Sequence, residues 1–169
     1  MRERKGRAGG RGPAAIVFIS GGLAAVAALA VRLWAGSPLP LLHTVGTAVR
    51  LPPLWTGGLL WFSAFFLLGC AAGTVVRETG GGPVRSAWRL RGGLYCLLAM
   101  LTALLWYPML FRSALLWLSL PLLLLSCAAA VLCLLCWARL RRAAVLPVSA
   151  FCCLMLYLFV TQLTVIFSR

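Results

Sequence analysis

Residues 54–76 have the sequence LWTGGLLWFSAFFLLGCAAGTVV, with no charged residue and no histidine. A run of about 20 apolar residues is long enough to cross the hydrocarbon core of a bilayer. Because lipid offers no hydrogen-bond partners, a spanning segment must satisfy its own backbone groups, and an α-helix does so. This stretch therefore predicts a transmembrane helix.

Four further strongly apolar stretches follow the same pattern, separated by short segments that carry arginine. They cover residues 14–34, 92–111, 113–138 and 143–168. The chain of 169 residues has 11% charged residues, whereas soluble domains carry about 25%. We expect an all-α membrane protein with one five-helix transmembrane domain over residues 14–169, preceded by a disordered basic tail at 1–13. Residues 77–91, which include Gly-Gly-Gly-Pro, are expected to form a loop.

The charges are strongly unbalanced, with 16 Lys and Arg residues against two acids, Glu3 and Glu78. A cytoplasmic N-terminus would place twelve of these basic residues inside and four outside, as the positive-inside rule requires. We therefore predict that the N-terminus is cytoplasmic, that the C-terminus is outside, and that the membrane is a bacterial cytoplasmic membrane. No aromatic-interleaved basic motif accompanies the charge, so we expect contact with anionic lipid at residues 139–142 and no nucleic-acid partner.

The interiors of the five stretches contain no Asp, Glu, Lys, Arg or His. Ion channels, proton-coupled carriers and intramembrane hydrolases place ionisable groups at membrane depth. Carboxylate pairs, Ser-His-Asp sets and metal clusters are also missing from the sequence. We predict no catalytic residue, no metal site and no required cofactor. The seven cysteines are interpreted as small packing residues, and His43 as a loop residue.

Aromatic and small residues supply the remaining signals. Four tryptophans lie near the ends of the stretches, where an interfacial belt is the ordinary interpretation, namely Trp34, Trp55, Trp88 and Trp137. Trp61 and Trp106 lie deeper. Gly69 and Gly73 form a G-x-x-x-G motif, which indicates a close helix–helix contact or a homodimer contact.

Three segments together resemble the TspO/translocator-protein family, the tryptophan-rich sensory proteins. The segments are Pro52-Pro53 with Trp61, Phe65, Gly69 and Arg77-Glu78; Trp106-Tyr107-Pro108 with Phe111; and Ala143-Ala144 with Pro147 and Phe151. The resemblance covers roughly residues 14–169. The polar positions of the family's third and fifth helices are replaced here, so the chain resembles a divergent member.

The resemblance implies a five-helix bundle, often dimeric, that binds porphyrins, haem and related tetrapyrroles, or sterols, between the helices and beneath the first loop. Carried over to this chain, the ligand-binding residues it implies are Trp61, Phe65, Trp106, Phe151 and Thr102, with Pro52 and Pro53 shaping the entry. Thr102 stands for an Asn of the family. A porphyrin or haem is accordingly the implied bound group.

The first functional hypothesis is a membrane-embedded binding protein for a tetrapyrrole-like or lipid-like hydrophobic ligand, acting as a sensor, carrier or regulator. The alternative is a structural or assembly protein that binds other membrane proteins through small-residue helix faces. A transporter ranks third, because coupling charges are missing from the spans. We do not expect an enzyme; the one candidate reaction is light-driven tetrapyrrole breakdown through Trp61 or Trp106.

Overall fold

The computed structural model describes residues 12–36, 54–77, 82–113 and 115–167. The helices in this part of the chain are α1 (Gly12–Ala35), α3 (Leu54–Val76), α4 (Pro83–Phe111), α5 (Leu116–Ala138), the short 3-10 helix η2 (Arg142–Ala144) and α6 (Val145–Phe167). Five of them are long and apolar enough to cross a membrane. The expectation of an all-α, multi-pass membrane protein is therefore confirmed.

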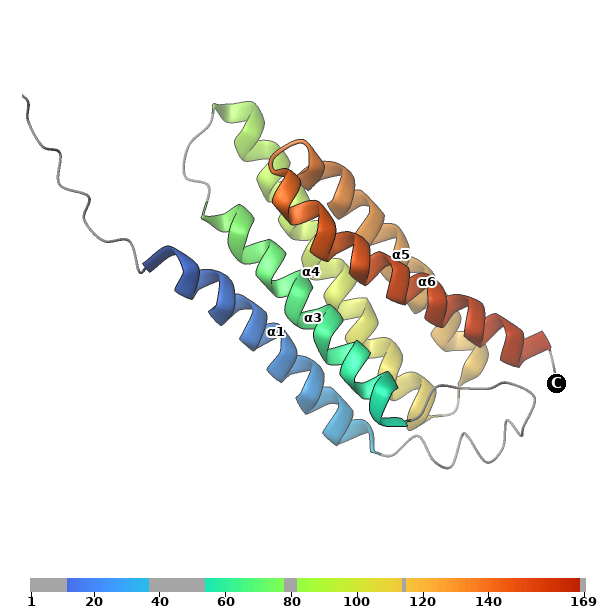
Figure 1. Cartoon of the computed structure of the whole chain (residues 1–169). Helices are drawn as coiled ribbons and strands as arrows, with labels where there is room; N and C mark the ends of the chain where they lie inside the picture. Colours follow the sequence, from blue (N-terminus) through green and yellow to red (C-terminus); the bar gives the residue numbers. More distant parts are fainter. Residues whose placement is uncertain (1–11, 37–53, 78–81, 114, 168–169) are drawn as a thin grey trace, which may run out of the picture.

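The five long helices run side by side and alternate in direction along the chain (Figure 1). The closest pairs are α1 with α3 and α4 with α5, and α6 packs on both α5 and α3. Helix α1 lies at the edge of the bundle, and Phe18, Leu23 and Leu33 on its outer face are exposed. In a bilayer this outer face would contact lipid chains.

Small residues line the contact between α1 and α3. A Cβ atom at Gly69 would lie 2.5 Å from the backbone oxygen of Ser20 and 2.8 Å from the Cβ of Ala24. A Cβ atom at Gly73 would overlap the Ser20 hydroxyl. That hydroxyl donates a hydrogen bond of 2.8 Å to the backbone oxygen of Gly69. The G-x-x-x-G motif of α3 is thus occupied by α1 of the same chain.

Helix α4 begins at Pro83 rather than near residue 92. The prediction of a loop over 77–91 is wrong from this proline onward, because the first helical position needs no N–H and proline starts a helix well there. The additional turns carry Trp88, whose ring lies 4.6 Å from the Arg139 guanidinium carbon. This cation–π contact joins the start of α4 to the end of α5.

Trp137 is buried, with 1% of its surface exposed. Its ring packs on Gly92 of α4, where a Cβ atom would overlap the indole and lie 3.1 Å from the Cβ of Cys136. The interpretation of Trp137 as an interfacial belt residue is wrong, because the glycine lets the indole enter the helix contact. Trp34, in contrast, is 64% exposed at the end of α1.

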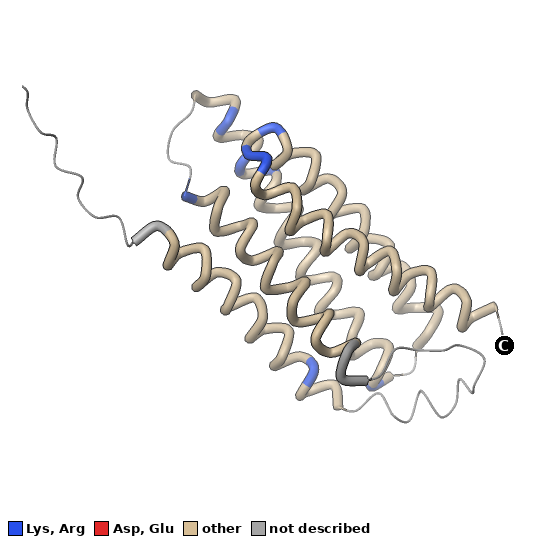
Figure 2. Tube along the Cα trace, viewed as in Figure 1, with Lys and Arg blue, Asp and Glu red and all other residues tan. Residues whose placement is uncertain are grey.

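The two ends of the bundle differ in charge (Figure 2). One end holds seven of the described arginines, namely Arg77, Arg85, Arg89, Arg91, Arg139, Arg141 and Arg142. The opposite end, where α1 and α4 finish, holds Arg32 and Arg112. The described residues include no Asp or Glu, so neither group of arginines meets an acidic side chain within them.

Several expectations fall on residues that the structure does not describe. They concern the tail before Gly12, His43, and the entry prolines Pro52 and Pro53. Helix α1 itself begins at Gly12, inside the stretch expected to be a disordered tail.

Replacing Gly69 with alanine should loosen the α1–α3 contact, because the new methyl group would press on the α1 backbone. Overpacking of this kind costs about 1–3 kcal/mol, and we expect a lower melting temperature in detergent or nanodiscs. Gly22→Ala is the matched control, since a Cβ atom there meets nothing within 4 Å. Equal melting temperatures for the two variants would contradict the packing described here.

Candidate functional site

Aromatic side chains from three helices form one connected group, the aromatic cluster. Its members are Trp61, Phe65, Trp106, Tyr107, Phe111 and Phe151. The ring of Trp61 lies at the centre, with centroid distances of 4.8 Å to Phe65, 5.5 Å to Tyr107 and 5.8 Å to Trp106. Distances in this range give favourable ring–ring contacts.

Helical spacing explains how the cluster is assembled. Trp61 and Phe65 are four residues apart, so they lie on the same face of α3. Tyr107 and Phe111 are likewise four apart on α4, with centroids 4.5 Å apart. Phe151 of α6 meets Phe65 edge-on, at 5.6 Å and an interplanar angle of 83°. The contacts of α3 with both α4 and α6 therefore close the group.

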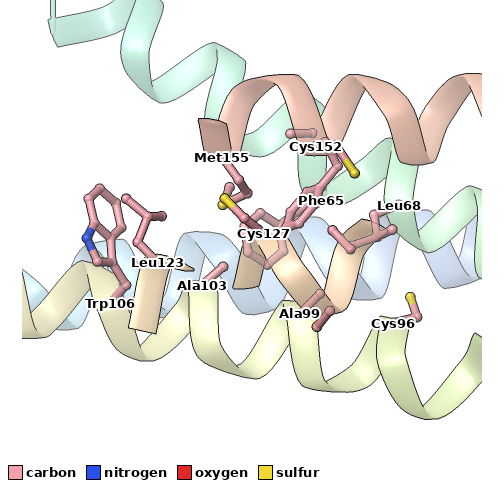
Figure 3. Close-up of a cluster of buried hydrophobic side chains, with 14 of the residues drawn as sticks. Phe65, Leu68, Cys96, Ala99, Ala103, Trp106, Leu123, Cys127, Cys152 and Met155 are labelled. Atoms are coloured by element: carbon pink, nitrogen blue, oxygen red, sulfur yellow. The ribbon is translucent and has the colours of Figure 1, made fainter. Parts of the chain in front are cut away.

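The structure brings four of the predicted ligand-binding residues together. Trp61, Phe65, Trp106 and Phe151 are each at most 4% exposed. Phe65 contacts both Trp61 and Phe151, so its ring occupies the space between them. Figure 3 shows Phe65 among buried side chains from the neighbouring helices, including Met155. A ligand that enters between these rings has to move them apart.

The other predicted residues lie elsewhere. Thr102 is buried on α4, and its hydroxyl donates to the backbone oxygens of Leu98 and Ala99 in its own helix. Gly69 and Gly73 face α1, as described above. The Thr102 hydroxyl oxygen can still accept a hydrogen bond, and its role toward a ligand stays a prediction.

Gln162 of α6 is the polar centre beside the aromatic cluster and is 4% exposed. Its side-chain oxygen accepts a 2.8 Å hydrogen bond from Trp106 Nε1. Its Nε2 donates to the backbone oxygen of Leu116 and to the hydroxyl of Ser119, both at 2.7 Å. A single amide therefore joins α4, α5 and α6.

Trp61 differs from Trp106 in its hydrogen bonding. The Nε1 atom of Trp61 is buried and has no hydrogen-bond partner among the described residues. A buried donor left without a partner costs about 1–3 kcal/mol, so an acceptor that reached it would bind favourably. Trp61 therefore presents an unused donor inside an otherwise apolar group of rings.

The predicted ligand-binding residues do not include Gln162, Tyr107 or Phe111. The sequence does place Gln162 and Tyr107 among the polar residues of the spans, which are expected to hydrogen-bond between helices or to orient a ligand. Tyr107 adjoins Trp106 in sequence, and adjacent residues on a helix do not face the same way. Both rings nevertheless contact Trp61, at 5.8 Å for Trp106 and 5.5 Å for Tyr107, and only the placement of α3 against α4 shows this.

Five of the cysteines are buried among the helices, Cys70 is partly buried and Cys153 is exposed. Cys96 of α4 and Cys133 of α5 are buried, and their thiols are within hydrogen-bonding reach of each other. Within the described segments, no group of three or more His, Cys, Asp or Glu side chains is arranged to hold a metal ion.

No family model, curated protein or solved structure matches this chain. The resemblance to the TspO family therefore depends on the sequence motifs alone and stays a prediction.

We expect Gln162→Leu to destabilise the bundle, because it leaves Trp106 Nε1 without its acceptor and Ser119 without its contact. Interhelical hydrogen bonds in membranes contribute about 0.6 kcal/mol each, so the loss should be about 1–2 kcal/mol. Denaturant titration of the purified protein in mixed micelles measures it. Thr164→Val is the control, since that exposed hydroxyl bonds only within its own helix; an equal effect of both changes would refute the role of Gln162.

Proposed function

We propose that this protein is a membrane-embedded binding protein for a hydrophobic, ring-containing ligand, tetrapyrrole-like in chemistry, and that the aromatic cluster is its binding site. The single observation that carries the proposal is the buried N–H of Trp61. It lies among aromatic rings and has no partner among the described residues. A flat ligand would stack on the rings and accept that hydrogen bond.

The positions of the other residues support the proposal. Trp61, Trp106 and Phe151 come from three different helices, and the resemblance to the TspO family implies all three as ligand-binding residues. Trp61 contacts Trp106 and Phe65, and Phe65 contacts Phe151, so the rings form the connected group that a shared ligand site requires. As a sensor, carrier or regulator, the protein would report or hold the ligand without reacting with it.

The contacts of Phe65 with Trp61 and Phe151 indicate what movement a ligand would require in order to bind. Because Phe65 fills the space between Trp61 and Phe151, the ligand-free arrangement is closed. Binding would select or create a state in which α3 or α6 has shifted and these rings have separated. Such a state couples ligand binding to helix movement, which is the physical requirement for a sensor.

The filled centre also favours the second hypothesis, a structural protein that assembles with other membrane proteins. In that case the binding face is not the G-x-x-x-G motif, because α1 already covers Gly69 and Gly73. The exposed outer face of α1, with Gly22 open to its surroundings, is then the candidate face.

Protoporphyrin IX titration tests the ligand proposal directly. We expect a shift of the porphyrin Soret band with the wild type and an affinity about fivefold lower for Trp61→Phe, which keeps a ring but loses the N–H. Trp117→Phe is the matched control, since Trp117 is 71% exposed and lies outside the cluster. A missing Soret shift, or equal affinities for Trp61→Phe and the wild type, would refute this site.

We also propose that the end with seven arginines faces the cytoplasm of a bacterial cell, as the positive-inside rule predicts. A C-terminal alkaline phosphatase fusion should then be active, and a C-terminal green fluorescent protein fusion should be dark. Replacing Arg139, Arg141 and Arg142 with asparagine should raise the fraction of inverted molecules. The opposite reporter pattern for the unaltered chain would overturn the orientation.

A further inference from the structure

Arg32 stands in the last turn of α1, at the end of the bundle where α4 finishes with Trp106, Tyr107 and Phe111 of the aromatic cluster. Its guanidinium turns toward the neighbouring helices. It fills the place that a Cβ atom at Gly58 of α3 would occupy, and its central carbon lies 5.5 Å from the ring centroid of Phe62. The guanidinium is also within hydrogen-bonding reach of the Tyr107 hydroxyl on α4.

An ordinary arginine at the end of a transmembrane helix extends toward the lipid headgroups and the water beyond them. Arg32 is instead inserted between α3 and α4, and Gly58 is the residue that leaves room for it. Tyr107, its partner on α4, contacts Trp61 with a centroid distance of 5.5 Å. The cation therefore borders the cluster that contains the unpaired indole N–H.

The described residues include no Asp or Glu, so Arg32 meets no acidic side chain among them. Its contacts there are the Phe62 ring and the Tyr107 hydroxyl, and neither neutralises its charge. An oxyanion supplied by another molecule would do so.

We infer that Arg32 binds the carboxylate of the ligand whose apolar rings the aromatic cluster holds. The inference depends on the proposed function and adds the ligand class to it: a flat apolar ring system with a carboxylate at its edge. A guanidinium and a carboxylate form paired, charge-assisted hydrogen bonds. Such bonds are stronger at the partly buried border of a protein than in water.

The test compares two probes that share one ring system, protoporphyrin IX with its two carboxylates and its uncharged dimethyl ester. Both are titrated by Soret absorbance into the full chain in phosphatidylcholine nanodiscs. We expect the wild type to prefer the acid about tenfold, the scale of one charge-assisted hydrogen bond. Arg32→Gln should abolish this preference while leaving the affinity for the ester unchanged.

Two further variants protect the test against a folding defect. Gly58→Ala keeps the charge but displaces the guanidinium, and it should reduce the preference as well. Gly57→Ala is its matched control, because a Cβ atom there meets nothing within 4 Å. Arg112→Gln removes the other described arginine at this end, which stacks on Trp34 at 4.8 Å, and should keep the full preference.

The outcomes separate this inference from the proposed function. If both probes bind and Arg32→Gln retains the preference for the acid, Arg32 does not bind the carboxylate and the inference is overturned. If neither probe binds the wild type, the proposed function fails and the inference fails with it. The wild type could also bind the acid and the ester with equal affinity, and this result would overturn the inference. If Arg32→Gln then changed only how the melting temperature depends on lipid, Arg32 would be assigned to a lipid phosphate.

Discussion

Lipid chains are as apolar as the side chains of these helices, so close packing and interhelical hydrogen bonds must hold the bundle together. Polar side chains of the described residues make such bonds between different helices. Ser20 joins α1 to α3 through Gly69, Ser126 joins α5 to α4 through the backbone oxygen of Ala99 at 2.9 Å, and Gln162 joins α6 to α5 and α4. The rest of the helix order depends on these few contacts and on the small residues beside them.

Because polar groups are scarce in the bundle, the side chains of Trp61 and Arg32 stand out. Trp61 and Trp106 belong to one aromatic cluster, yet only Trp106 has a hydrogen-bond acceptor among the described residues. Arg32 borders that cluster, and the part of the chain that the structure describes holds no Asp or Glu to pair with it. Trp137 Nε1, toward the opposite end of the bundle, is likewise buried without a partner among the described residues. What sets Trp61 apart is the cation that borders its cluster, and this pairing is consistent with the proposed ligand, which would supply an acceptor and an anion.

The two ends of the bundle differ in the charged and aromatic residues that they carry. One end holds seven of the described arginines, and two of them, Arg91 and Arg139, contact the Trp88 ring. The contact with Arg139 joins α4 to the end of α5. At the other end, Arg32 and Arg112 lie against aromatic rings of neighbouring helices. The proposed orientation would bring the arginine-rich end to an anionic membrane surface, and the proposed ligand would bind nearer the opposite end.

The sequence by itself determined the five helices and their approximate bounds, because an apolar run in lipid can satisfy its backbone only as a helix. Its motifs also selected Trp61, Phe65, Trp106 and Phe151, which prove to be neighbours. Only the tertiary structure decided that α1 covers the G-x-x-x-G motif, that Trp137 is buried, and that the rings of the predicted pocket touch one another. Helices that are apolar on all sides do not reveal which face meets which neighbour, so these contacts become known only once the helices are placed.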